Sequence, residues 1–141
     1  MAYKGKFRPQ NHKKYRGDHT KIIYRSGWEL KFMNYLDRQP EVISWSSEEV
    51  IIPYRSPIDN KVHRYYPDFW VKTLQGESLV EIKPKKQTRP PKENPKHRRR
   101  YLKEVKVWGI NSAKFKAAEH FCRAKGWEWR IITEDTFKLT K

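Results

Sequence analysis

The sequence predicts an α/β (α+β) fold in which a central mixed β-sheet is flanked by helices, in the order αβββαβ. A helical pattern comes first, over residues 27–38. Short segments rich in aromatic and β-branched residues follow it, and a second clear helical pattern and a last strand-like segment occupy residues 112–125 and 127–132. Because parallel strands need a long crossover connection, this helix allows the last strand to join the sheet in parallel.

Two end signals and an apolar face predict the first helix. Ser26 is a suitable N-cap with Glu29 three residues later, and Gln39-Pro40 ends the helix. At about 100° per residue, Asp37 and other polar residues lie largely opposite the apolar face. That face consists of Trp28, Phe32, Met33, Tyr35 and Leu36.

Glu29 falls in the middle of this apolar face. A carboxylate directed toward a core costs free energy unless something compensates it. Two explanations stay open. Glu29 either caps the helix or forms a buried ion pair, or it points along the core toward acidic residues of the sheet. In the second case it could bind a second metal, hold a metal-bound water or orient a lysine.

Strands are expected over residues 42–45, 50–54, 65–71 and 78–83, the last two joined by a tight turn around Gln75-Gly76. Pro67 inside a strand pattern suggests an edge or a bulge that re-aims Asp68. Side chains two apart on a strand share a face, so Glu81 lies beside Lys83, and Asp68 can meet Glu81 across the strand pair.

These residues predict a metal site. Two carboxylates beside an amine suit Mg²⁺, for which Mn²⁺ is expected to substitute. We expect Asp68 and Glu81 to hold the ion, with the backbone carbonyl of Ile82 as a third ligand. The ion would polarise a phosphodiester and activate water, while Lys83 stabilises charge that develops on the phosphate. The alternative is an acidic turn at Asp68 and a surface ion pair between Glu81 and Lys83.

Two further acidic residues, Glu48 and Glu49, separate the first two strand segments. They form either a solvated turn or, for Glu48, a group that faces the same cluster.

The composition favours a polyanionic partner. The 141 residues include 32 basic and 16 acidic ones, a net charge of +16. Nucleic acid is therefore expected ahead of a membrane surface, and no apolar run is long enough to span a bilayer. The one cysteine, Cys122, excludes an internal disulfide and fits the apolar stripe of the helix over 112–125.

Residues 1–20 are expected to form a basic arm, either disordered or draped over a single domain that spans 21–141. A proline-rich basic loop over 85–96 and a helix from 97 to about 107 follow the acidic segment, and Asn111 or Ser112 then caps the helix that Gly126 ends. None of these features reads base edges, so we expect DNA binding with little sequence specificity. The residues expected to contact DNA are Lys13, Lys14, Arg16, Lys85, Lys86, Arg89, Arg98, Arg99 and Arg100.

Pro67-Asp68, Glu81-Ile82-Lys83 and the helical Glu29 together resemble the motif of the restriction-endonuclease-like, PD-(D/E)XK superfamily of nucleases. The resemblance covers residues 21–132. It implies a restriction-endonuclease-like core and a Mg²⁺-dependent endodeoxyribonuclease, with Glu29, Asp68, Glu81 and Lys83 as catalytic residues.

A longer set of segments is similar to the head-completion proteins of T-even-type bacteriophages. They are Met1–Lys6, Lys14–Asp18, Tyr24–Glu29, Ile52–Tyr54, Glu81–Lys86 and Ile132–Asp135. This resemblance implies action on packaged DNA ends before tail attachment, with head, portal or neck proteins as partners. The place would be the host cytoplasm during assembly or the head–tail junction of the virion.

Two other functions stay open. One is a non-catalytic structural protein that binds the DNA end or the portal. The other is an endonuclease outside the virion, either resolvase-like or like the transposase endonuclease subunit of some bacterial transposons, which shares the signature. The sequence leaves the oligomeric state and the form of the DNA substrate open.

Overall fold

A four-stranded mixed sheet forms the centre of the computed structural model, which describes residues 4–139. Its strands lie in the order β3-β6-β7-β8, and their bounds are Val42–Ser47, Phe69–Thr73, Gly76–Ile82 and Glu128–Ile132. The β3/β6 and β6/β7 pairs are antiparallel, whereas β7 and β8 are parallel. The predicted mixed sheet is therefore confirmed.

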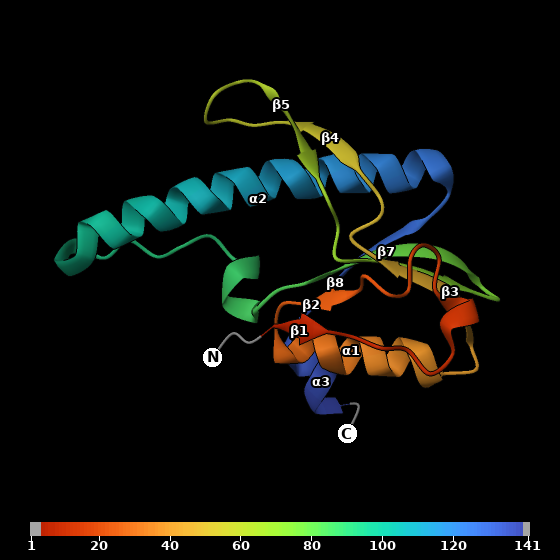
Figure 1. Cartoon of the computed structure of the whole chain (residues 1–141). Coiled ribbons are helices and arrows are strands. Elements are labelled where there is room, and N and C mark those ends of the chain that lie inside the picture. The colour runs from red at the N-terminus through yellow and green to blue at the C-terminus, as the bar shows by residue number, and fades with distance from the viewer. Residues whose placement is uncertain (1–3, 140–141) are drawn as a thin grey trace.

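One helix covers each face of this sheet (Figure 1). Helix α1, Gly27–Arg38, packs Met33 and Leu36 on the face that carries Trp45 and Phe69. On the other face, Ala118 and Cys122 of α2, Arg98–Lys125, pack against Trp70 and Leu79. Cys122 is thus a buried apolar residue, as the stripe predicted.

Short elements complete the described chain. Strands β1 and β2, Gly5–Lys6 and Ile23–Tyr24, pair in antiparallel. Three 3₁₀ turns, η1, η2 and η3, span His12–Lys14, Lys85–Thr88 and Pro95–His97, and helix α3, Glu134–Leu139, follows β8.

A separate hairpin corrects the prediction around Pro67. Strands β4, Ile52–Arg55, and β5, Val62–Tyr65, pair with each other and pack on α2 rather than entering the sheet. The expected strand over 65–71 is therefore two strands, β5 and β6, and Pro67 lies between them rather than in a bulge. Proline cannot donate to a strand ladder, so it fits the point where the chain passes from hairpin to sheet.

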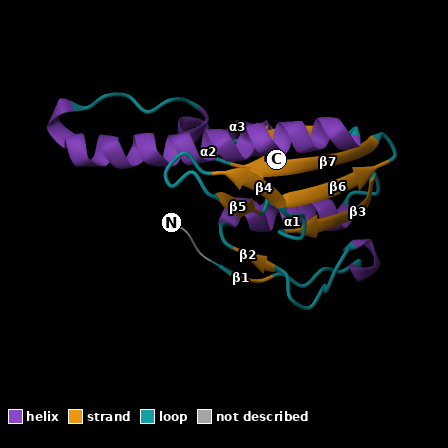
Figure 2. Cartoon of the chain, turned by 90° about the horizontal axis from the view of Figure 1, so that it is seen from above, coloured by secondary structure: helices purple, strands orange, loops and turns teal. Residues whose placement is uncertain are grey.

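Helix α2 corrects a second prediction, because residues 98–125 form one helix where two were expected. Asn111 and Ser112 lie inside it and cap nothing; Gly126 ends it with a φ of +72°. The β4–β5 hairpin lies against the middle of α2: a Cβ at Gly109 would lie 3.8 Å from Pro57. Tertiary packing of this kind overrides weak local helix signals. The N-terminal half of α2 projects past the sheet with the loop over 84–97 beside it (Figure 2).

The described part of the basic arm packs against the body. Phe7 and Tyr15 belong to the core on the α1 face. Asp37, expected on the wet side of α1, is 2% exposed because its carboxylate accepts hydrogen bonds from the backbone N–H groups of Gln10 and Asn11, at 2.8 and 3.0 Å. Tyr35, expected in the core, is 42% exposed.

Candidate active site

Asp68 and Glu81 meet where β6 begins and β7 ends. The register pairs Phe69 with Val80, which brings the flanking acids opposite each other. The backbone N–H of Asp68 donates to Oε1 of Glu81 at 3.2 Å, and the N–H of Ile82 donates to Oδ2 of Asp68 at 2.8 Å. These bonds fix both carboxylates on rigid strand ends.

Three other side chains surround Glu81. Tyr65 donates its hydroxyl to Oε1 of Glu81 at 2.6 Å, and Lys83 Nζ lies 3.6 Å from Oε2. Lys114 comes from α2, with its Nζ 5.5 Å from the centre of the Tyr65 ring and 5.8 Å from that of Tyr54. Oε1 of Glu81 therefore accepts two hydrogen bonds, from Tyr65 and from the N–H of Asp68, and a cation lies near Oε2.

Burial disfavours the ionised form of both carboxyl groups in this acidic pair. It raises the pKa of Asp68 well above its ordinary value, and the negative charge of Glu81 raises it further. Burial also raises the pKa of Glu81, while the hydrogen bond from Tyr65 and the charges of Lys83 and Lys114 oppose the rise. Two neighbouring buried carboxylates favour a cation that allows both to ionise.

The donor set fits Mg²⁺ and does not resemble a transition-metal cage. In the part of the chain that the structure describes, no group of three or more His, Cys, Asp and Glu residues could hold a metal. Mg²⁺ is typically bound by one or two carboxylates, with water and substrate phosphate as further ligands. Asp68 and Glu81 are such a pair.

Glu29 makes the contacts of a helix cap and also lies near the acidic pair. Its N–H donates to Ser26 Oγ at 3.1 Å and its Oε1 accepts the N–H of Arg25 at 3.4 Å, which is a capping arrangement. Its side chain is also half-buried beside the acidic pair: burial raises the pKa of Glu29, and its charge contributes to the raised pKa of Asp68.

Glu48 lies at the border of the same site. Its carboxylate receives two hydrogen bonds from Arg25, at 3.1 and 3.0 Å, and its backbone N–H donates to the carbonyl of Asp68 at 3.1 Å. Glu48 has a φ of +54°, an uncommon backbone conformation for a residue other than glycine. The carboxylate of Glu48 therefore pairs with Arg25, and only its backbone contacts Asp68.

The structure distributes the predicted DNA contacts over two regions. Lys13 and Lys14 belong to η1, and Lys14 Nζ donates to the carbonyls of Asp37 and Gln39 at the C-terminal end of α1, at 3.1 and 2.7 Å. Arg16 lies over the Trp70 ring, 4.9 Å from its centre. Lys14 therefore has a structural role that the sequence did not indicate.

The other predicted contacts follow β7. Lys85 is tied to α3 by an ion pair with Asp135 at 3.1 Å, whereas Lys86 and Arg89 are exposed on the loop. Arg98, Arg99 and Arg100 do not adjoin the carboxylates as the sequence suggested. They start α2, about 20 Å from Lys114 at about 1.5 Å per helical residue.

Tyr65 and Lys114 were missed by sequence reasoning. Tyr65 stands three residues before Asp68, but strand alternation would place the two side chains on opposite faces, so the pattern did not point to it. No signal pointed to Lys114, because its approach to Glu81 depends on how α2 crosses the hairpin.

A family of known proteins matches most of the chain, including the segment that carries the acidic pair. Residues 39–134 match the family model described as TnsA-like endonuclease N terminal. The chain belongs to this family. The matched segment includes Asp68, Glu81 and Lys83 but starts after α1, so Glu29 lies outside it.

A curated relative extends the comparison to nearly the full chain. The protein is 45% identical to the "Head completion nuclease" of Enterobacteria phage T4, over 96% of this chain and 93% of the relative. No solved structure matches it significantly. As a TnsA-like endonuclease domain, the protein is a nuclease with a restriction-endonuclease-like fold, and none of its described helices is long and apolar enough to cross a membrane.

Proposed function

We propose that the protein is a Mg²⁺-dependent DNA nuclease of the PD-(D/E)XK type that acts on packaged DNA ends in phage head completion. The observation that carries the chemistry is the pair of half-buried Asp68 and buried Glu81, with Lys83 Nζ 3.6 Å from Glu81. The biological setting rests on the head completion nuclease to which the chain is similar.

The residues divide the work. Asp68 and Glu81, with the carbonyl of Ile82, would hold Mg²⁺, which supplies Lewis-acid activation of the phosphodiester and of water when bound. Lys83 places a positive charge where the phosphate gains negative charge. Glu29 orients groups from the first helix, and Tyr65 holds Glu81 in one orientation.

DNA is gripped through its phosphates. The net charge of +16 and the exposed cations near the site support backbone contacts with little sequence preference, and Lys14 and Lys85 contribute less because they are engaged within the protein. We expect affinity to fall steeply with salt, through release of counterions.

A plasmid and linear-DNA cleavage assay tests the proposal. Activity should require Mg²⁺ or Mn²⁺, disappear in EDTA and be lost in Asp68→Asn. If DNA remains uncut under all these conditions while the protein still binds it, the non-catalytic structural alternative is correct. Activity that is unchanged in both Asp68→Asn and Lys83→Ala would rule out the metal mechanism.

The head-completion setting is preferred over transposition for one reason. The phage relative matches over 93% of its own length, whereas the endonuclease family model matches residues 39–134. Assembly of phage heads in a host that supplies either the protein or Asp68→Asn tests this setting: heads that accept tails equally well in both cases would contradict it.

A further inference from the structure

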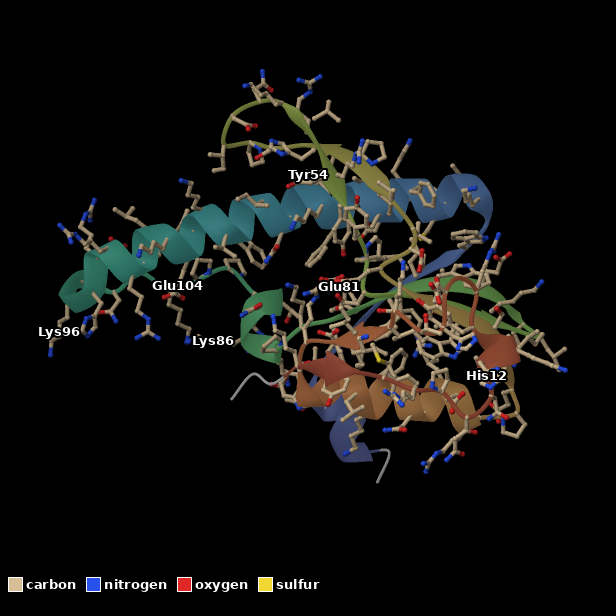
Figure 3. All side chains as sticks on the ribbon, viewed as in Figure 1. His12, Tyr54, Glu81, Lys86, Lys96 and Glu104 are labelled. Carbon is tan, nitrogen blue, oxygen red and sulfur yellow. The ribbon has the colours of Figure 1, made fainter. Side chains whose placement is uncertain are left out.

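A hollow of about 820 Å³ lies between the loop after β7 and the projecting half of α2. Its loop wall includes Lys86 and Arg89, and its helix wall includes Lys103 and Trp108. In Figure 3, Lys86 on η2 and Glu104 on α2 lie on the two sides of this space, and Glu81 lies beyond its inner end.

The hollow adjoins the candidate active site at its inner end. Lys86 is three residues past Lys83 along the chain. Asn111, which also lines the hollow, stands one helical turn before Lys114 on α2. Both walls therefore continue along the chain toward Lys83 and Lys114, on the side of the hollow where the candidate active site lies.

The lining is strongly cationic. Five described side chains that line it are basic, and one, Glu104, is acidic. Glu104 is paired within its own helix, since Arg100 Nε lies 3.5 Å from its Oε1. The basic lining residues are Lys86, Arg89, Lys92, Arg100 and Lys103.

Apolar surface lies between these cations. The indole of Trp108 and the side chain of Val107 line the helix side, and Pro90 and Pro91 line the loop side. Flat or apolar groups alternating with phosphate-binding cations are the features with which proteins hold single strands, because unpaired bases stack on aromatic rings. An acidic peptide could pair with the basic side chains, but it would offer no base to stack on the indole of Trp108.

The size excludes a duplex. The volume is within the roughly 300–1,000 Å³ of pockets that enclose small ligands, which suits one or two nucleotides but not a double helix whose major groove alone is about 12 Å wide.

From these observations we infer that the hollow holds an unpaired DNA strand, so that the preferred substrate is a DNA end with a single-stranded overhang. The inference rests on the proposed function in taking DNA as the substrate. It adds that duplex DNA lies outside the hollow while the unpaired strand passes between loop and helix, stacked on Trp108.

Binding in EDTA tests the inference without cleavage. The full chain is titrated into fluorescent duplexes that are blunt or carry a short 5′ or 3′ overhang, and anisotropy is read at several salt concentrations. We expect about tenfold tighter binding of one overhang than of the blunt end, as for stacking of a base. In Trp108→Leu this preference should disappear, and Trp108→Phe should restore part of it.

Lys103→Gln gives a second readout that does not touch the apolar packing. It should weaken binding of the overhang and lower the slope of log affinity against log salt by about 0.7. Lys106→Gln is the matched control: it is exposed on the same helix but does not line the hollow, so the preference should survive. Thermal melts confirm that each variant is folded.

The outcomes separate this inference from the proposed function. Equal binding of blunt and overhang DNA, or a preference that survives both Trp108→Leu and Lys103→Gln, would overturn it. Displacement of the overhang by poly-glutamate at equal charge would also overturn it, in favour of an acidic peptide. An overhang preference in a protein that cleaves nothing with Mg²⁺ would support the hollow and refute the nuclease mechanism alone.

Discussion

The hydroxyl of Tyr65 lies 2.6 Å from Oε1 of Glu81 and so joins the β4–β5 hairpin to the central sheet at the candidate active site. Burial and the adjacent charge of Glu81 raise the pKa of Tyr65, so the phenol stays protonated and donates at every physiological pH. The hairpin thereby positions a carboxylate on a strand to which it is not paired.

Tyr65→Phe should therefore lower the affinity of the site for Mg²⁺, so that cleavage needs a higher Mg²⁺ concentration, without unfolding the protein. Loss of a partner that orients a metal ligand typically costs about 10–100-fold in metal affinity or activity. The ring still packs on Phe115 and Trp129, so circular dichroism should be unchanged. The measurement is the Mg²⁺ concentration for half-maximal cleavage, with Tyr15→Phe as a buried control away from the site. An unchanged concentration in Tyr65→Phe would contradict the positioning role.

Lys83→Ala should reduce cleavage by about 100-fold or more while leaving DNA affinity nearly unchanged, because its charge acts where the phosphate becomes more negative. Lys85→Ala is the control, since that side chain is 51% exposed and pairs with Asp135 instead. Single-turnover cleavage and binding in EDTA separate the two effects. A loss of affinity that matches the loss of rate would indicate simple charge attraction.

Lys114→Met should move the acid limb of the cleavage profile to higher pH. Burial raises the pKa of Glu81, and the positive charge of Lys114 is among the effects that oppose this rise, so its removal leaves the pKa higher. The limb reports an apparent pKa of the acidic pair as a unit. Lys116→Met, on an exposed position of the same helix, should leave the profile in place. An acid limb that stays in place in Lys114→Met would show that Lys114 does not act on Glu81.

Asp68→Asn should stabilise the metal-free protein at neutral pH. The folded-state pKa of Asp68 is raised, so its favourable contribution is present below the unfolded value of about 3.9 and is lost as pH rises through the folded pKa. Removing the charge should therefore raise the free energy of unfolding in EDTA at neutral pH.

Thermal melts at several pH values check this, and the gap between wild type and Asp68→Asn should close at low pH. Asp59→Asn is the opposite control: hydrogen bonds from Lys61 and His63 lower the pKa of Asp59, so this change should destabilise at neutral pH. If Asp68→Asn were less stable than the wild type in EDTA, the protein itself would already stabilise the two ionised carboxylates without a metal ion.

Asp37→Ala should release the basic arm. The buried carboxylate satisfies two backbone N–H groups of the arm, and leaving them unpaired costs about 1–3 kcal/mol. Faster hydrogen exchange over residues 4–20 is the expected signature. Asp18→Ala, which removes an exposed carboxylate within the arm, should leave exchange near Gln10 unchanged.

Local pattern was sufficient for several elements and for three site residues. Ser26, Glu29 and Gln39 predicted both ends of α1, and the alternation around Glu81 placed Lys83 on the same side. These features depend on contacts between near neighbours in the chain, which spacing alone encodes. Their meeting with Asp68 followed from a tight turn that fixes the register.

The sequence by itself determined the order of the central elements, the convergence of Asp68, Glu81 and Lys83, and the polyanionic partner. Only the tertiary structure decided that α2 is one helix, that Asp37 is buried and that β4 and β5 form a separate hairpin. It also decided that Tyr65 contacts Glu81 and that Lys114 lies over the Tyr65 ring. Each of these features depends on a long-range contact whose free energy outweighs weak local preferences. The periodicity of a segment does not show which distant part of the chain will pack against it.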